Sequence, residues 1–204
     1  MTRCVLAAAL AAAVVTPAFT QTPATQAAGS KTWSVDSAHS GAHFSVRHMM
    51  VSTVRGSLGN VSGTIEYDGT SADSIRANIT IDVAAITTGN QSRDNDLKSP
   101  TFFDVAKSPT LTFTSRRVEP AGPGKFRMIG DLTMHGVTKE VALNVEGPSP
   151  ILKTPNGAQR VGASVTATLN RRDFNLQYNV MIEAAPIVGD EIQVQVDIEA
   201  TKRG

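Results

Sequence analysis

The chain has 204 residues, of which 41% are hydrophobic and 18% are charged, and its formal net charge is +1. This length suffices for one domain with a sizeable core. The charges are dispersed and form no basic run, which argues against nucleic acid and anionic membrane surfaces as partners.

The first thirty residues have the layout of a secretory leader rather than of a folded element. One basic residue, Arg3, precedes an apolar run over 5–15, and the helix-breaking Pro17 and small residues follow. The run is too short to span a bilayer, so the pattern predicts a signal peptide. Residues 1–28 are expected to hold this peptide and the start of a polar tail, with cleavage between 18 and 28. The exported protein is then expected in the periplasm.

The single cysteine, Cys4, lies in this leader, so the exported chain has no thiol for a disulfide or a metal site. Loss of the leader also removes Arg3, which leaves 18 basic and 18 acidic residues. No internal repeat and no second composition shift follow. A single domain over 31–202 is therefore predicted.

Period-two alternation of apolar and polar residues dominates the chain after residue 30. The stretches IRANITIDV (75–83), VGASVTATL (161–169) and EIQVQVDIEA (191–200) each place their apolar residues on one face. Such alternation predicts half-buried antiparallel strands with one wet face. Weaker versions of the pattern cover four more segments: 33–35, 42–48, 54–67 and 110–118.

A hairpin with a definite register is predicted over 126–145, around a turn at His135–Gly136. Glycine supplies the positive φ that such a turn needs, and histidine tolerates it better than most residues. One face then carries nearly all the apolar residues, as a correctly registered hairpin requires. The predicted pairs on that face are Met134–Val137, Leu132–Lys139, Gly130–Val141, Met128–Leu143 and Phe126–Val145.

The strand count comes to eight or nine, with one short polar helix near 92–98. Many regularly spaced strands with few helices indicate a barrel or a sandwich. Long strands with one continuous apolar face favour a closed barrel, which leaves no exposed edge. We therefore expect an all-β fold, an antiparallel barrel of about eight strands. Its interior would be just wide enough to pack shut or to hold a slender ligand.

The sequence contains no arrangement typical of catalysis. His39 and His43 share a face of an extended segment but stand too far apart to bind one zinc ion together, and His48 has the opposite parity. A long-range metal site that includes His135 stays open at this point. Nucleophile elbows, phosphate loops and dinucleotide fingerprints are absent. We expect no enzymatic activity, no bound metal and no cofactor.

Two groups of charged residues are candidates for the end of the barrel. The segment LNRRDFNL (169–176) follows an apolar strand and could close the end through an Arg–Asp pair or contact a polar headgroup. Lys139 is the one charged residue on the apolar face of the hairpin, where it could extend to solvent or meet an anionic headgroup. Arg171 and Lys139 are the possible headgroup contacts.

Several motifs then carry a resemblance to a known family. DSAHS (36–40), PTFFDVAKSPTLTF (100–113), LTMHGVTK (132–139) and NRRDF (170–174) resemble, in this order, motifs of the YceI-like family of secreted lipid-binding proteins. The matching segments extend over 33–200. One departure is Asn175, where the family usually has glycine, although asparagine also tolerates a left-handed backbone.

The resemblance implies a lipocalin-like, elongated barrel whose tunnel holds a polyisoprenoid or a similar long amphiphilic lipid. It implies transport, storage or sequestration without catalysis, often by a homodimer, and no stable membrane insertion. Six family positions are expected to be apolar and buried: Phe44, Val46, Phe102, Phe103, Phe113 and Phe174. The alternation adds four further candidates for the tunnel lining: Leu132, Met134, Val141 and Val194.

A second hypothesis needs no ligand. The same phenylalanines could simply pack a filled core, and the barrel would then act as an interaction or stress-protective module through its outer face. The sequence does not distinguish a hollow barrel from a filled one.

Overall fold

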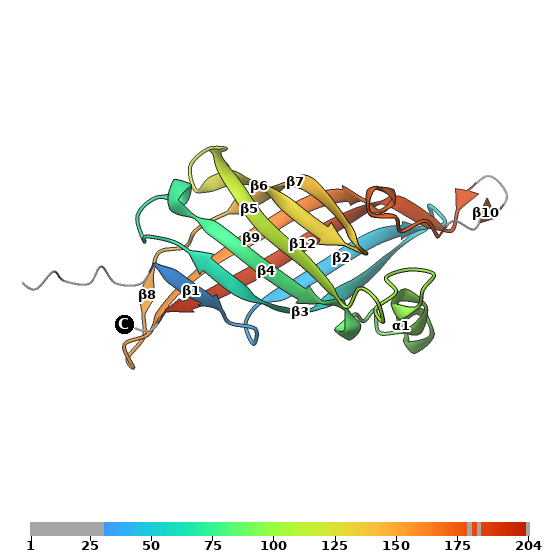
Figure 1. Cartoon of the computed structure of the whole chain (residues 1–204), viewed down its shortest axis with the longest axis horizontal. Coiled ribbons are helices and arrows are strands. Elements are labelled where there is room, and N and C mark those ends of the chain that lie inside the picture. The colour runs from blue at the N-terminus through green and yellow to red at the C-terminus, as the bar shows by residue number, and fades with distance from the viewer. Residues whose placement is uncertain (1–30, 179–180, 183–184, 203–204) are drawn as a thin grey trace, which may run out of the picture.

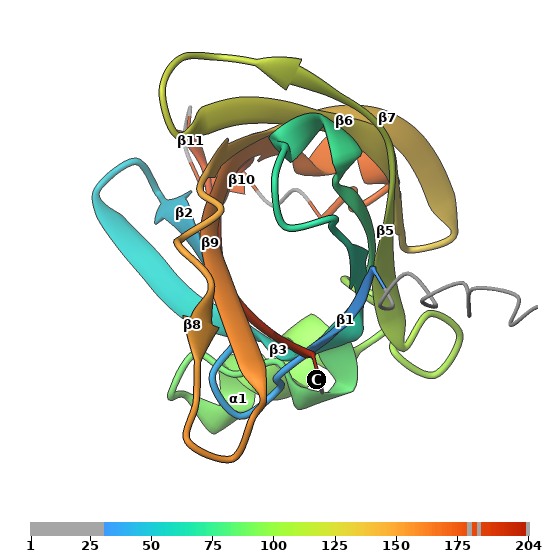
Figure 2. The same cartoon turned by 90° about the vertical axis from the view of Figure 1, so that its left-hand side faces the viewer.

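The computed structural model describes residues 31–178, 181–182 and 185–202, so the expected leader at 1–28 lies outside the described residues. Eight strands form a closed antiparallel ring in the order β12-β2-β3-β4-β5-β6-β7-β9, which closes where β9 pairs with β12 (Figures 1 and 2). The predicted all-β barrel with one short helix is therefore confirmed.

The ring strands are β2 (Gly41–His48), β3 (Ser52–Glu66), β4 (Arg76–Asp82), β5 (Thr110–Pro120), β6 (Lys125–Met134), β7 (Val137–Glu146), β9 (Gln159–Asn170) and β12 (Val188–Lys202). Two short strands extend the sheet: β1 (Thr32–Val35) pairs with β12 and β3, and β8 (Leu152–Lys153) pairs with β9. A separate small hairpin joins β10 (Met181–Ile182) to β11 (Ala185–Pro186). The helical elements of the described part are α1 (Gln91–Lys98) and three 3-10 turns, η1 (Ala72–Ser74), η2 (Val83–Ala85) and η3 (Arg171–Phe174).

The predicted β6–β7 register is confirmed. All five predicted pairs occur, from Met134 opposite Val137 to Phe126 opposite Val145. His135 has φ +49° and Gly136 has φ +74°, so His135 takes the left-handed conformation that the turn requires. Asn175 behaves in the same way, since its φ of +59° ends η3 where the family usually has glycine.

One end of the barrel is densely packed. The fully buried Trp33 of β1 donates its indole N–H to the Tyr67 carbonyl at 3.0 Å, and the two rings lie 6.3 Å apart. Phe126 and Val145 are buried in the same cluster. The Lys202 ammonium lies 4.7 Å from the centre of the Trp33 ring, on its face. We call this the packed end; it is the left-hand end in Figure 1.

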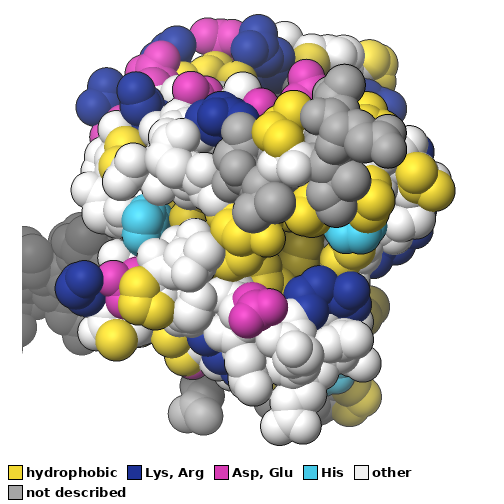
Figure 3. Space-filling view, turned by 90° about the vertical axis from the view of Figure 1, so that its right-hand side faces the viewer, with side chains coloured by type: hydrophobic (Ala, Val, Ile, Leu, Met, Phe, Trp, Pro, Cys, Tyr) yellow, Lys and Arg dark blue, Asp and Glu magenta, His cyan; other side chains and the backbone are white. Residues whose placement is uncertain are grey.

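The opposite end carries α1, the β2–β3 turn and the β10–β11 hairpin (Figure 1). No helix among the described residues is long and apolar enough to cross a membrane. At this end the surface is hollowed, and the floor of the hollow is formed by hydrophobic side chains (Figure 3). We call this the mouth of the barrel.

Candidate ligand cavity

An apolar cavity of about 230 Å³ follows the barrel axis. Its wall includes Phe103 and Leu176 toward the mouth and reaches Tyr67 and Ala200 toward the packed end. Among the described residues that line it, Tyr67 and Arg171 are the two with polar side chains. The inward face of the strands therefore offers a ligand dispersion contacts and almost no hydrogen-bonding partner.

Most residues that the sequence analysis placed in a tunnel do line this cavity. They are Phe44, Val46, Phe102, Phe103, Phe113, Leu132, Met134 and Val194. Two of the rings lie over glycines on the neighbouring strand. A Cβ on Gly56 would meet the Phe44 ring at 2.7 Å, and one on Gly130 would meet the Phe113 ring at 2.6 Å. These glycines leave room for the rings against the wall.

Two of the residues predicted to line the tunnel, Val141 and Phe174, do not line this cavity. Val141 is half-buried and lies opposite Gly130, against which the Phe113 ring packs. Phe174 is almost fully buried in η3 and packs within the core cluster at the mouth instead of facing the cavity.

Arg171 is the charged residue of the wall and is only 3% exposed. Its guanidinium donates to the carbonyls of Leu176 at 2.6 Å and Gly189 at 3.0 Å, and to Asp190 Oδ1 at 2.9 Å. Burial lowers its pKa from the ordinary value, and the Asp190 carboxylate opposes that shift. The Arg–Asp pair expected at the barrel end is thus present, but its carboxylate comes from β12 rather than from the neighbouring Asp173.

Arg172 shares the same carboxylate. Its Nε lies 2.8 Å from Asp190 Oδ2, yet the N–H is not directed at an acceptor, so the contact is an ion pair without a hydrogen bond. Two guanidinium groups therefore share one carboxylate at the mouth. The second proposed headgroup contact, Lys139, is placed differently: it is exposed, is not part of the cavity wall and makes no ion pair among the described residues.

The buried carboxylate of Asp94 holds α1 in place at the mouth, where the helix contributes apolar side chains. Asp94 Oδ1 accepts the Thr88 N–H at 2.7 Å and the Thr88 hydroxyl at 2.6 Å, while Oδ2 accepts the Thr87 hydroxyl at 2.8 Å. These bonds, from Thr88 above all, lower the pKa of Asp94. The helix and its following loop are thereby fixed with Leu97 and Phe102 in the cavity wall.

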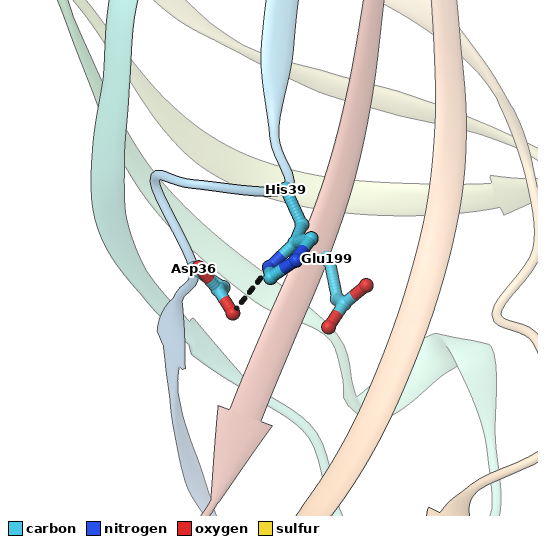
Figure 4. Close-up of side chains that lie close together, drawn as sticks. All are labelled: Asp36, His39 and Glu199. Carbon is cyan, nitrogen blue, oxygen red and sulfur yellow. Dashed lines mark hydrogen bonds and ion pairs between the residues drawn. The ribbon is translucent and has the colours of Figure 1, made fainter.

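The packed end carries a possible metal-ligand group. Atoms of Asp36, His39 and Glu199 lie within 4.8 Å of one another (Figure 4). However, the Arg160 guanidinium contacts both carboxylates, at 3.0 Å from Asp36 Oδ2 and in a closer contact with Glu199. His39 Nδ1 lies 2.9 Å from Asp36 Oδ2 and is the main cause of the lowered pKa of Asp36. Because a cation already lies between the carboxylates, we interpret the group as an ion-pair network.

Comparisons with known proteins agree on one family. The model of the YceI-like domain matches residues 33–200. A UPF0312 protein of Staphylococcus aureus is 32% identical over 165 residues, which is 80% of this chain and 94% of that protein. A solved YCEI protein of Campylobacter jejuni is 31% identical, with a TM-score of 0.66 over 78% of this chain and 90% of that one.

Two more distant structures share the fold. BcnA of Burkholderia cenocepacia is 24% identical, with a TM-score of 0.67 over 81% of this chain and 98% of that one. A polyisoprenoid binding domain from Saccharophagus degradans is 17% identical, with a TM-score of 0.61 over 82% of this chain and 97% of that one.

Proposed function

The chain belongs to the YceI-like family, and from this premise we propose that its barrel binds the tail of a polyisoprenoid or similar long amphiphilic lipid. The observation that carries the proposal is the cavity wall, in which nearly every side chain is apolar. The polyisoprenoid-binding domain from Saccharophagus degradans, which has the same fold, supports this ligand class.

The size of the cavity favours a thin, flexible ligand. About 230 Å³ is slightly below the roughly 300–1,000 Å³ of typical small-molecule sites. A single acyl or prenyl chain lying along the axis needs less width than a ring system, and methionine side chains in the wall adapt their shape easily. Each methylene buried there contributes about 0.8 kcal/mol. Affinity would therefore increase with tail length.

The proposed role is binding, for transport, storage or sequestration, without chemistry. Among the described lining residues, Tyr67 and Arg171 have polar side chains, and burial raises the pKa of Tyr67. The leader pattern in 1–28 supports a periplasmic location, and cell fractionation would test it. The homodimer stays a prediction, which sedimentation velocity would test.

The central experiment is purification of the protein from its membrane-bearing native host, followed by solvent extraction and mass spectrometry. We expect an isoprenoid-type lipid to be released. Ligand binding should also raise the melting temperature, since a ligand that binds only the folded state stabilises it. If repeated extractions release no lipid and no lipid analogue shifts the melting temperature, the proposal is wrong.

A pair of variants on β9 tests whether the ligand occupies the barrel. Ala167 lines the cavity, whereas its neighbour Thr166 is exposed on the outer face. Ala167→Phe should abolish lipid co-purification by filling the axis, and Thr166→Phe should retain it. Equal lipid content in both folded variants would place the ligand outside the barrel.

A further inference from the structure

Exposed apolar side chains gather beside the mouth. Met50 is 58% exposed and Val51 is 81% exposed in the β2–β3 turn, and Met181 of the β10–β11 hairpin is 51% exposed. The β2–β3 turn follows directly on the cavity wall, because the wall residue Val188 pairs with His48 at the base of the turn. The exposed apolar side chains of the turn therefore lie next to a strand that lines the cavity.

The conformation of the β2–β3 turn gives no reason for these residue types. Met49 has φ +51° and Met50 has φ +58°, and the turn is closed by the Val51 N–H donating to the His48 carbonyl at 3.0 Å. Two successive left-handed residues belong to the I′ class of turn, for which Asn-Gly is the favoured pair. Methionine is strained there, and the exposed Met50 gains little packing in return. The folded chain by itself would be better served by Asn-Gly.

The tip is nevertheless held in a fixed position. The Arg47 guanidinium donates to the Met50 carbonyl at 2.6 Å and to the Thr53 hydroxyl at 3.0 Å. The Met49 N–H donates to the Ile187 carbonyl at 2.9 Å, which ties the turn to the segment between β11 and β12. The apolar tip is thus presented rigidly at the mouth.

The hairpin that carries the tip is locally basic, although the chain as a whole is nearly neutral. Residues 37–65 contain no aspartate or glutamate. Arg47 and Arg55 are exposed on the outer face of the hairpin, and neither forms an ion pair with a carboxylate in the part of the chain that the structure describes. Both Lys or Arg and Asp or Glu side chains lie beside the hollow in Figure 3. The sequence indicates dispersed charge with no basic run, but this hairpin carries a local positive charge.

We propose that the β2–β3 tip docks the mouth onto the surface of an anionic lipid bilayer. Exposed apolar side chains enter the headgroup region, and nearby arginines attract negatively charged headgroups. This inference rests on the proposed function, because a docked mouth would let a lipid tail pass between bilayer and barrel without crossing water. The contact is peripheral and involves no membrane-spanning element.

The test is flotation of the purified full chain with vesicles of phosphatidylcholine alone and with one-third phosphatidylglycerol. The variant Met49→Asn/Met50→Gly installs the favoured turn pair, so it should fold at least as well while losing the apolar tip. We expect it to bind anionic vesicles at least about tenfold more weakly than the parent chain. Arg55→Gln, which removes no hydrogen bond in the described structure, should weaken binding about fivefold at low salt.

Leu152 provides the matched control, because it is 63% exposed and lies in β8 near the packed end. Leu152→Ser should leave vesicle binding unchanged. The docking proposal is overturned if the parent chain does not float with anionic vesicles, if the turn variant floats equally well, or if Leu152→Ser has the same effect. A turn variant that instead changes the sedimentation coefficient would assign the tip to contact between copies.

Lipid content separates this inference from the proposed function. The turn variant should still contain co-purified lipid, because its cavity wall is intact, but should take up lipid from vesicles more slowly. A chain that floats normally yet never contains lipid would contradict the proposed function and leave the docking surface in place.

Discussion

The two ends of the barrel use similar residues for different purposes. At the packed end, Trp33 is fully buried and Arg160 neutralises two carboxylates at the surface. At the mouth, Phe102 is only partly buried in the cavity wall, and the buried Arg171 satisfies backbone carbonyls. Both ends therefore have a buried apolar cluster, but the mouth also has partly buried apolar side chains, such as Phe102, in the cavity wall.

The largest expected effect tests this division directly. Trp33→Ala should lower the free energy of unfolding by ~3–5 kcal/mol, because it removes a buried aromatic ring and its hydrogen bond to Tyr67. Phe102→Ala at the mouth should cost about 1 kcal/mol, since that ring is already half-exposed. Both losses in free energy of unfolding are measured by urea unfolding monitored by far-UV circular dichroism, a signal that does not depend on the tryptophan. Equal losses would contradict a difference between the ends.

The next effect concerns the arginines at the mouth. Arg171→Met should lower stability by about 3 kcal/mol, because it leaves buried carbonyls and Asp190 without their main donor. Arg172→Met should cost at most ~1 kcal/mol, because Arg172 is a third exposed and its ion pair is solvent-screened. The same urea titration, repeated at high salt, distinguishes them. A larger loss for Arg172→Met would reverse the assignment.

Low pH should destabilise both ends of the barrel, and an Asp94 variant distinguishes the contribution of the mouth from that of the packed end. The pKa values of Asp36 and Asp94 are both lowered on folding from an ordinary value of 3.8. A lowered pKa stabilises the folded state above that value, and this stability is lost as the pH falls through the folded-state pKa. Asp94→Asn should therefore flatten the dependence of the urea midpoint on pH below about 4.

The control for this acid effect is Asp96→Asn on the same helix. Its carboxylate makes no hydrogen bond or ion pair among the described residues, and the pH dependence should be unchanged. If both asparagine variants flatten the curve equally, the buried hydrogen bonds of Asp94 are not the cause.

The smallest expected effect concerns Lys139. Because it is exposed and outside the cavity wall, Lys139→Met should change stability by no more than about 0.5 kcal/mol and should leave lipid content unchanged. Lipid extraction from the variant measures the second point. A clear loss of lipid would restore Lys139 as a headgroup contact and extend the binding site beyond the mouth.

Local sequence patterns predicted the parts of the fold that depend on neighbouring residues. The β6–β7 register followed from alternation around His135–Gly136, and Asn175 was recognised as a substitute for glycine in a left-handed turn. The same alternation and the family motifs suggested eight residues that line the cavity, which has many other residues in its wall.

The parts that were missed depend on contacts distant in sequence or on exposure. Nothing local to Arg171 shows that its carboxylate is Asp190 on another strand. The Phe113 ring of β5 packs over Gly130 of β6, a close approach that depends on the strand pairing. Met50 and Val51 are apolar, so the sequence alone suggests core positions, but both are exposed. The nearly neutral net charge of the whole chain does not show that the hairpin on which they lie is basic.

The closing strand has a consequence for how the molecule forms. Val194 of β12 pairs with Phe44 on one side and with Ala167 on the other, so the ring joins the earliest and latest strands of the barrel. During synthesis β12 is the last strand to emerge, and until then β2 and β9 remain open edges that can pair with other chains. Such long-range pairing makes folding slow. The ring is therefore complete only when this final fifteen-residue strand has paired on both sides.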